Sequence, residues 1–315
     1  MRWCSFTARP PRPDAAGAGP ARLGVVNALD GRVLDVGGWA KSRGAEVPAD
    51  LVDLVEASRA VQEQVGELVR SVPADGPDWI TASAVRLLAP VRAPNSLRDF
   101  LAFPDHVARG AARRGTAVPE AWDRIPVFYK GNRRSIVGPD EVVVWPSYTE
   151  QMDFECEVAA IVGRGGRDLG EAAADHVFGY TIMNDWSARD IQRDEMSCWL
   201  GPAKAKDFAT TLGPWLVTPD EWSPEQPHTM EVLVDGELWS TGQTAGRRWT
   251  FAEMLAWASR EEDLYPTDVL GSGTFGGGCG LDLDRWLGPD VTVTLRVQGL
   301  GELSNRVVRR HGAPD

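Results

Sequence analysis

Residues 153–158 read DFECEV, and the apolar run AAIVG follows directly at 159–163. Polar and apolar residues alternate with a period of two, which is typical of a half-buried β-strand. On such a strand Glu155 and Glu157 share one face, and Phe154, Cys156 and Val158 share the other. Since two like charges on one face repel each other, we expect both carboxylates either to lie in water or to be held by a cation.

A second stretch, GYTIMNDWSARDIQ at 179–192, begins with β-prone residues and continues into helix-compatible ones. Its Asn-Asp pair is typical of a turn or a helix N-cap. A helix that begins there would place Asp185, Arg189 and Gln192 on one face, at spacings of i, i+4 and i+7. The alternative is an N-cap aspartate with a surface ion pair, which contributes only a few tenths of a kcal/mol.

The two stretches together favour a metal site. Glu155, Glu157 and Asp185 supply three hard oxygen ligands, a set that suits Mg²⁺, Mn²⁺ or Ca²⁺ and leaves positions for water and a chelating substrate.

Composition limits the class of protein. The formal net charge of −12 argues against a nucleic-acid binder, which would need a basic surface. A few local Arg and Lys residues can still bind an anionic substrate. No apolar run approaches the roughly 20 residues that cross a bilayer. The first residues lack a continuous apolar signal region, so we expect a cytoplasmic protein.

The four cysteines, Cys4, Cys156, Cys198 and Cys279, lie far apart and include no CxxC pair. The spacing therefore argues against a disulfide framework and against a zinc-thiolate site. The four histidines are scattered as well, which argues against a three-histidine metal site. We expect Cys156, which alternates with the glutamates, to lie in the core.

The pattern of short β-prone runs predicts an α+β protein that is mainly β. Residues 1–75 form a predicted small N-terminal domain, with strands at 22–26 and 32–36 and a helix over 48–71. Residues 76–315 form the predicted second domain, in which further helices are expected at 171–177 and 249–260. Frequent Gly, Pro and Asp residues between the runs favour an antiparallel or mixed sheet over a regular βαβ array.

At this point the chain resembles the fumarylacetoacetate hydrolase family of β-diketone hydrolases and related 2-oxo-acid enzymes, in particular its bacterial fumarylacetoacetases and acylpyruvate hydrolases. The resemblance runs in family order over about residues 100–285. It rests on DFLAFPDH (99–106), PVFYKGN (126–132), DFECEV (153–158), GYTIMNDWSARDIQ (179–192), Lys206-Asp207-Phe208 and LGSGTFGGG (270–278). It implies a catalytic domain built as a mixed β-sandwich roll, preceded by a small N-terminal α/β domain.

The resemblance also implies roles for particular residues. Asp99, Glu155, Glu157 and Asp185 match the metal ligands, and Mg²⁺ is the favoured ion, with Mn²⁺ or Ca²⁺ as alternatives. His106 occupies the place of the general base. Residues that match positions binding the substrate's oxygens or carboxylate are Tyr129, Arg189, Gln192, Lys206 and Thr274. Among these, Lys206, Arg189 and Gln192 are also catalytic candidates. Lys206 would stabilise the product enolate, Gln192 or Lys206 would help to protonate it, and Arg189 would hold the substrate carboxylate.

Two departures from the family concern the partner of His106. The hydrolase branch pairs its histidine with a glutamate after the glycine-rich loop, and the aligned stretch here offers Asp282. Another branch has a glutamate three residues after the histidine, where this chain has Arg109. Asp282, or failing that Asp105, must therefore orient His106.

The glycine-rich stretch GSGTFGGGCG (271–280) lacks the GK[ST] ending of a phosphate-binding loop. A mobile loop that closes over the substrate and presents Thr274 fits better. We also expect Trp186 and Trp199, which flank the second motif, to line the site.

The implied function is a divalent-metal-dependent hydrolase that cleaves a carbon–carbon bond in a β-diketo acid, in aromatic-compound catabolism. Alternatives are a hydratase, isomerase or decarboxylase of a related 2-oxo acid, and a non-catalytic metal-binding member. The expected partners are a small oxo-acid substrate and, from the resemblance alone, a second copy of the chain.

Overall fold

The computed structural model describes residues 1–9 and 19–309. Its largest sheet contains β1 Arg2–Ala8, β2 Arg22–Val26, β3 Val33–Asp35, β4 Trp79–Ile80, β5 Val85–Leu88, β6 Leu97–Phe100, β7 Phe128–Lys130, β8 Ile136–Val137, β11 Cys156–Val162, β12 Val177–Asp185, β14 Thr210–Val217 and β17 Val269–Gly271. The main path of this sheet runs β4-β3-β2-β1-β14-β12-β11-β17-β6-β7, and most pairs are antiparallel. The pair β17–β6 is parallel.

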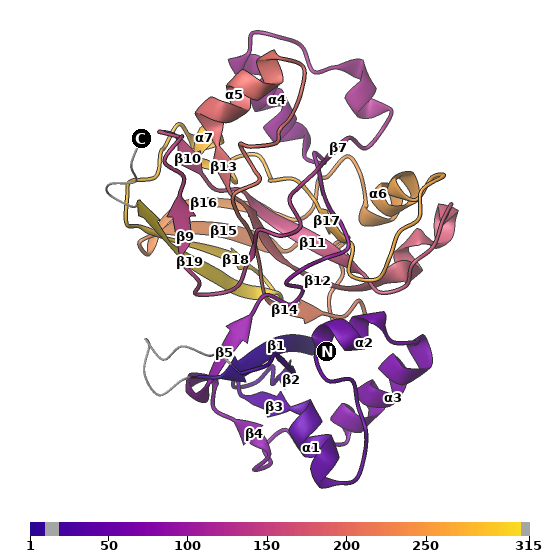
Figure 1. The fold of residues 1–315 in the computed structure, drawn as a ribbon. Helices are drawn as coiled ribbons and strands as arrows, with labels where there is room; N and C mark the ends of the chain where they lie inside the picture. The colour runs from indigo at the N-terminus through magenta and orange to yellow at the C-terminus, as the bar shows by residue number, and fades with distance from the viewer. Residues whose placement is uncertain (10–18, 310–315) are drawn as a thin grey trace.

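A five-stranded sheet lies beside the large one (Figure 1). It has the order β16-β15-β18-β19-β9, with β9 Val143–Trp145, β15 Thr229–Val234, β16 Glu237–Gln243, β18 Thr292–Val297 and β19 Gly301–Arg309. A short ladder joins β10 Met152–Asp153 to β13 Ser187–Ala188. The mixed sheets and the few helices confirm the predicted α+β, mainly β class.

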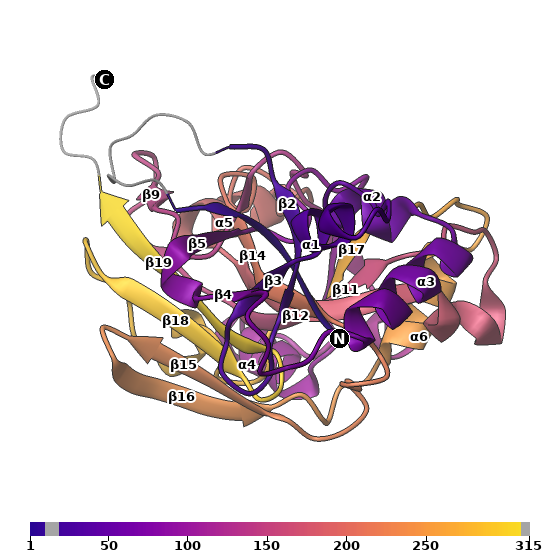
Figure 2. The same cartoon turned by 90° about the horizontal axis from the view of Figure 1, so that it is seen from below.

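The helices lie around these sheets, as Figures 1 and 2 show. They are α1 Val36–Ser42, α2 Leu51–Glu56, α3 Arg59–Arg70, α4 Pro104–Arg113, α5 Arg189–Ser197, α6 Phe251–Ala258 and α7 Gly280–Leu283, with 3₁₀ turns η1 Ala82–Ala84, η2 Glu120–Asp123 and η3 Gly170–His176. None of the helices in the described ranges is long and apolar enough to cross a membrane.

Strand β11 is buried on both faces, which explains why AAIVG follows the alternating stretch. Val158, Ala160 and Val162 belong to a core shared with the five-stranded sheet. Ala159 and Ile161 face the opposite side, in a core shared with the N-terminal helices. Glu157 lies two residues before Ala159 and therefore on the same face of β11. It stands near the beginning of the strand, where apolar residues no longer cover that face.

Two expected helices differ from the structure. The predicted helix over 48–71 is two helices, because Ala57 is extended and Ser58 caps α3 by accepting a hydrogen bond from the Val61 N–H. The Gln62 amide donates to three carbonyl groups around this break and so stabilises it. The helix expected at 171–177 is the 3₁₀ turn η3.

The expected helix at 249–260 is confirmed as α6, and it begins with a capping box in which Thr250 and Glu253 exchange hydrogen bonds. Strands at 22–26 and 32–36 are confirmed as β2 and β3. The domain boundary near residue 75 stays a prediction. Beyond it, β4 pairs with β3 and β5 pairs with β1.

Candidate metal centre

Four carboxylates converge at one end of the strands β6, β11 and β12. Asp99 lies on β6, Glu157 on β11 and Asp185 is the last residue of β12. Glu155 precedes β11, and its backbone forms an isolated β-bridge with Cys279. One oxygen of each carboxylate lies within 4.8 Å of the others, and all four residues are buried. The predicted ligand set is therefore brought together from neighbouring strands.

Glycine residues make room for these carboxylates. Strand β17 lies between β11 and β6, and Gly271 pairs with Ala159 on one side and Asp99 on the other. A Cβ atom at Gly271 would lie 2.4 Å from Asp99 Oδ1 and 3.0 Å from Glu157 Oε2. Two residues on, the Gly273 N–H donates to the same two oxygens, at 3.3 and 3.1 Å. The glycine-rich segment thus forms one wall of the centre.

The positively charged side chains of Arg189 and Lys206 form the opposite side of the centre, and both are buried. Arg189 donates to Asp153 Oδ2 at 2.8 Å and to Glu155 Oε1 at 2.7 Å. Lys206 donates to Glu155 Oε2 at 2.8 Å and to Asp185 Oδ2 at 2.5 Å. Glu155 is therefore paired on both of its oxygens.

Among the remaining predicted substrate-binding residues, Tyr129 donates to Asp185 Oδ2 at 2.8 Å. Gln192 accepts a hydrogen bond from Arg189 at 2.9 Å. Thr274 donates to the Cys156 carbonyl at 3.1 Å. Their roles toward a substrate stay predictions.

Mutual repulsion and burial shape the ionisation of the carboxylates. Burial, and then the charge of Asp185, raises the pKa of Asp99. Burial, and then the charge of Asp99, raises the pKa of Glu157. Burial also raises the pKa of Asp185 in spite of Lys206. Glu155 behaves differently, because the attraction of Lys206 and Arg189 outweighs its burial and lowers its pKa.

The arrangement fits a hard divalent cation. With the four carboxylates and Asp153 ionised, five negative charges against the two positive charges of Arg189 and Lys206 leave a net charge of −3. Glu157 Oε1 and Asp185 Oδ1 are buried and have no hydrogen-bond partner among the residues that the structure describes. Buried, unpaired carboxylate oxygens are costly unless they are protonated or bind a cation. Asp99, Glu157 and Asp185 would hold such an ion together with Glu155.

Beside this centre, His106 on α4 and Asp282 on α7 form a pair. His106 Nδ1 lies 2.9 Å from Asp282 Oδ2, which also accepts a hydrogen bond from the Gly277 N–H at 3.0 Å. Of the two acidic candidates, Asp282 is thus the one that contacts the imidazole. Arg109 contacts the backbone carbonyl of Asp282 at 3.4 Å. The shorter aspartate reaches His106 because α7 carries it there.

Two sequence-based expectations are wrong. Asp185 does not begin a helix: β12 continues to Asp185, and α5 begins only at Arg189. Pairing of β12 with both β11 and β14 outweighs the local capping preference of the Asn-Asp pair. Trp199, expected to line the site, is 95% exposed, whereas Trp186 is buried in the core and donates to Thr211.

The sequence also left two residues of the site without a role. Asp153 is buried and accepts hydrogen bonds from Arg189 and from the backbone N–H groups of Gly280 and Leu281. Asn184 accepts a hydrogen bond from the Glu155 N–H at 3.0 Å. Both residues stand inside the two motifs, so their position next to the ligands was the available signal.

Comparisons with known proteins agree with this geometry. The family model described as fumarylacetoacetate (FAA) hydrolase C-terminal matches residues 96–308. Protein Rv2993c of Mycobacterium tuberculosis is 31% identical over 265 residues, which cover 82% of this chain and 92% of that protein. The mitochondrial oxaloacetate tautomerase FAHD2B of Bos taurus is 29% identical over 298 residues, covering 92% and 88%.

Among solved structures, the fumarylacetoacetate hydrolase from the psychrophile Exiguobacterium antarcticum has a similar fold. The TM-score is 0.73, the sequence identity is 27%, and the match covers 98% of this chain and all of that one.

Proposed function

The chain belongs to the fumarylacetoacetate hydrolase family, and from this premise we propose that it is a divalent-metal-dependent hydrolase that cleaves a carbon–carbon bond in a β-diketo acid. The family includes hydrolases and isomerases, so the hydrolytic step needs its own support. The His106–Asp282 pair beside the four carboxylates carries the proposal, because hydrolysis requires a base that takes a proton from water. The proposed substrate resembles fumarylacetoacetate or an acylpyruvate, and the proposed setting is aromatic-compound catabolism.

A divalent cation bound at the carboxylates, Mg²⁺ first and Mn²⁺ or Ca²⁺ as alternatives, would supply Lewis-acid polarisation of a carbonyl oxygen. The residues of the chain do the rest. Because Asp282 Oδ2 accepts a hydrogen bond from the Nδ1–H of His106, Nε2 carries the lone pair and takes a proton from the attacking water. The water oxygen adds to the distal carbonyl carbon, the carbon–carbon bond breaks, and its electron pair leaves as an enolate. The enolate carbon then takes up the proton held on Nε2, which gives the keto product and restores the base.

Lys206 suits electrostatic stabilisation of that enolate. Burial alone would lower its pKa, but Asp185 and Glu155 outweigh burial and raise it. In the metal-free site these carboxylates hold Lys206 in its charged form through hydrogen bonds to Glu155 Oε2 and Asp185 Oδ2. We therefore assign Lys206 and Arg189 to charge stabilisation and carboxylate binding, and Gln192 to orientation of Arg189.

One observation favours a second candidate, a tautomerase or isomerase of a 2-oxo acid. The oxaloacetate tautomerase of Bos taurus is similar over 92% of this chain. Keto–enol conversion uses a base and an enolate-stabilising site but adds no water. A hydratase or decarboxylase would use the same groups.

The two candidates differ in their products. The metal-free protein is supplied with Mg²⁺ or Mn²⁺ and an acylpyruvate, ultraviolet absorbance is followed, and products are identified by NMR. We expect pyruvate and a second carboxylic acid in equal amounts. Loss of absorbance without two carboxylic-acid fragments contradicts the hydrolase and favours the tautomerase.

Variants test the base and its partner. We expect His106→Ala to lower turnover by about 10²–10⁴-fold, with the thermal shift produced by Mg²⁺ unchanged. Asp282→Asn should lower turnover, whereas the neighbouring Asp105→Asn serves as the matched control and should not. Equal losses in both aspartate variants would contradict the assignment of Asp282.

A further inference from the structure

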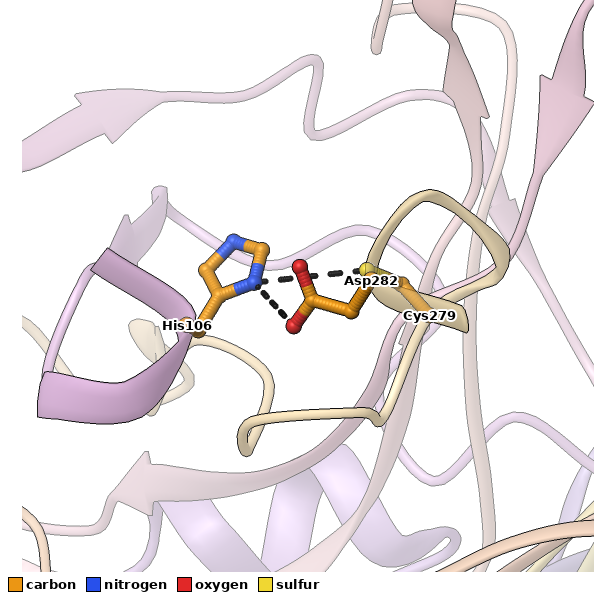
Figure 3. Close-up of side chains that lie close together, drawn as sticks. All are labelled: His106, Cys279 and Asp282. Atoms are coloured by element: carbon orange, nitrogen blue, oxygen red, sulfur yellow. Dashed lines mark hydrogen bonds and ion pairs between the residues drawn. The ribbon is translucent and has the colours of Figure 1, made fainter. Parts of the chain in front are cut away.

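A second cluster of potential ligands surrounds His106. Cys279 Sγ lies 4.0 Å from His106 Nδ1, and Asp282 Oδ2 lies 2.9 Å from the same nitrogen. Ligand atoms of all three side chains lie within 4.8 Å of one another. Figure 3 shows Asp282 pointing its carboxylate toward the imidazole, with the Cys279 sulfur beside it. The cluster offers one nitrogen, one sulfur and one oxygen, whereas the carboxylate centre offers oxygen alone.

The geometry does not fit a nucleophilic cysteine. In a Cys–His–Asp triad the acid contacts one ring nitrogen and the thiol contacts the other. Here Asp282 and Cys279 both lie on the Nδ1 side of His106, so Nε2 is left facing elsewhere. Burial also raises the pKa of the Cys279 thiol well above its usual value, which keeps it protonated when no metal is bound.

The cluster has unused binding capacity. Asp282 Oδ1 has no hydrogen-bond partner among the described residues. Water does not replace that partner readily, because the Asp282 side chain is only 1% exposed. Cys279 is fully buried and contacts His106 through its sulfur. A buried carboxylate with one unpaired oxygen, beside an imidazole and a thiol, is what an empty site for a borderline-soft cation would present.

The distances are close to those of tetrahedral zinc. Zn²⁺ binds N and O ligands at about 2.0–2.2 Å and S at about 2.3 Å, which places the ligand atoms about 3.3–3.6 Å apart. The observed separations, 2.9 Å for N···O and 4.0 Å for N···S, differ from these by roughly 0.5 Å. His106 is partly exposed, with 13% of its side chain accessible, so the fourth position can face solvent or substrate.

We propose that His106, Cys279 and Asp282 form a second, inhibitory metal site for Zn²⁺ or a similar borderline-soft cation. The cation binds the lone pair of Nδ1, the Cys279 sulfur and a carboxylate oxygen, and the thiol proton is released to solvent. The imidazole proton then resides on Nε2, so His106 loses the lone pair with which a general base takes a proton from water. Inhibition rests on the proposed function of His106, whereas metal binding does not.

The binding test uses Co²⁺ as a spectroscopic probe on the full-length, Mg²⁺-loaded protein. A Co²⁺–thiolate bond gives a near-ultraviolet charge-transfer band, which the all-oxygen carboxylate centre cannot give. We expect the band to saturate at one equivalent in the natural sequence and in Cys198→Ser, a control at the exposed cysteine. We expect its loss in Cys279→Ser. Absence of the band in the natural sequence, or its survival in Cys279→Ser, overturns the proposal.

The inhibition test adds Zn²⁺ at saturating Mg²⁺ and normalises each variant to its own rate without Zn²⁺. We expect Cys279→Ser to need at least about tenfold more Zn²⁺ for half inhibition than the natural sequence. Equal sensitivity overturns the inhibitory role. If β-diketo acids are not hydrolysed at all, the proposed function fails, and the Co²⁺ band still decides whether the site exists. A Mg²⁺-induced thermal shift in Cys279→Ser shows that the variant is folded.

Discussion

Replacement of Glu157 by glutamine gives a direct test of the carboxylate centre. Glu157 is fully buried, and its Oε1 has no hydrogen-bond partner among the described residues. Glutamine has nearly the same shape, and its carbonyl oxygen can still accept the Gly273 N–H. Glutamine lacks the negative charge of Glu157, which Asp99 and Asp185 repel. We predict that Glu157→Gln loses the stabilisation by divalent cations without destabilising the metal-free protein at neutral pH.

The size of the lost effect follows from binding linkage. A ligand that binds only the folded state adds about 2.7 kcal/mol to the free energy of unfolding at 100 times its Kd. An unfolding entropy of about 2.1 cal/mol/K per residue corresponds to about 0.66 kcal/mol/K for the 315 residues of this chain. Mg²⁺ at 100 times Kd should therefore raise the Tm of the natural sequence by about 4 °C. In the variant this shift should vanish.

The pH dependence of the metal-free protein gives a second readout. Asp99, Glu157 and Asp185 have raised pKa values in the folded state, so the folded state retains protons that the unfolded state has lost. Stability therefore falls as pH rises from the unfolded carboxyl values near 4 through the raised folded values. The lowered pKa of Glu155 acts in the opposite sense, but only at pH values below its unfolded one.

Thermal unfolding followed by circular dichroism between about pH 5 and pH 8 measures both effects. In EDTA, the Tm of the natural sequence should fall more steeply with rising pH than the Tm of Glu157→Gln. Addition of Mg²⁺ to the natural sequence should raise the Tm most at the higher pH. The exposed Glu46→Gln is the matched control for loss of one charge. An undiminished Mg²⁺ shift in Glu157→Gln, or parallel pH slopes in the two proteins, would refute the reasoning.

Two further substitutions test the walls of the centre. Gly271→Ala places a Cβ 2.4 Å from Asp99 Oδ1 and should cost about 1–3 kcal/mol and weaken the Mg²⁺ shift; Gly37→Ala, which has space, is the control, and similar losses in both would contradict this steric account. Arg189→Met leaves two buried carboxylates without their guanidinium and should cost about 3–5 kcal/mol in urea unfolding. The exposed Arg193→Met should stay within about 0.5 kcal/mol, and an equally small loss in Arg189→Met would show that this ion pair is not needed.

The sequence predicts those parts of the fold that depend on one strand and its two faces. Alternation in DFECEV and the apolar residues that follow predict a strand with Phe154, Cys156 and Val158 in the core, and all three lie there. Local propensity predicts the wrong element where strand pairing determines the backbone conformation. The backbone of Asp185 donates to the Glu155 carbonyl and pairs with Thr210, and these contacts extend β12 through a sequence that favours a helix start.

Such local sequence patterns do not predict contacts between distant segments. His106 and Cys279 are separated by 173 positions. Asp282 follows Cys279 at a spacing of three, but nothing in the sequence near either cysteine or histidine indicates that the two segments meet. The argument from spacing against a zinc-thiolate ligand is therefore valid only for ligands supplied by one local segment. Two distant segments, α4 with His106 and α7 with Asp282 and its N-cap residue Cys279, can still bring a thiol, an imidazole and a carboxylate together.

Asp153, the first letter of DFECEV, connects the two halves of the site. Its Oδ2 accepts from Arg189, which also pairs with Glu155. The same carboxylate accepts the N–H groups of Gly280 and Leu281, in the first turn of the helix that carries Asp282. A shift of Arg189 toward a substrate carboxylate would therefore also displace α7, and with it the contact between Asp282 and His106. The stretch 153–157, which contains Asp153 and two of the four carboxylates, thus connects the proposed metal centre to the helix that carries Asp282.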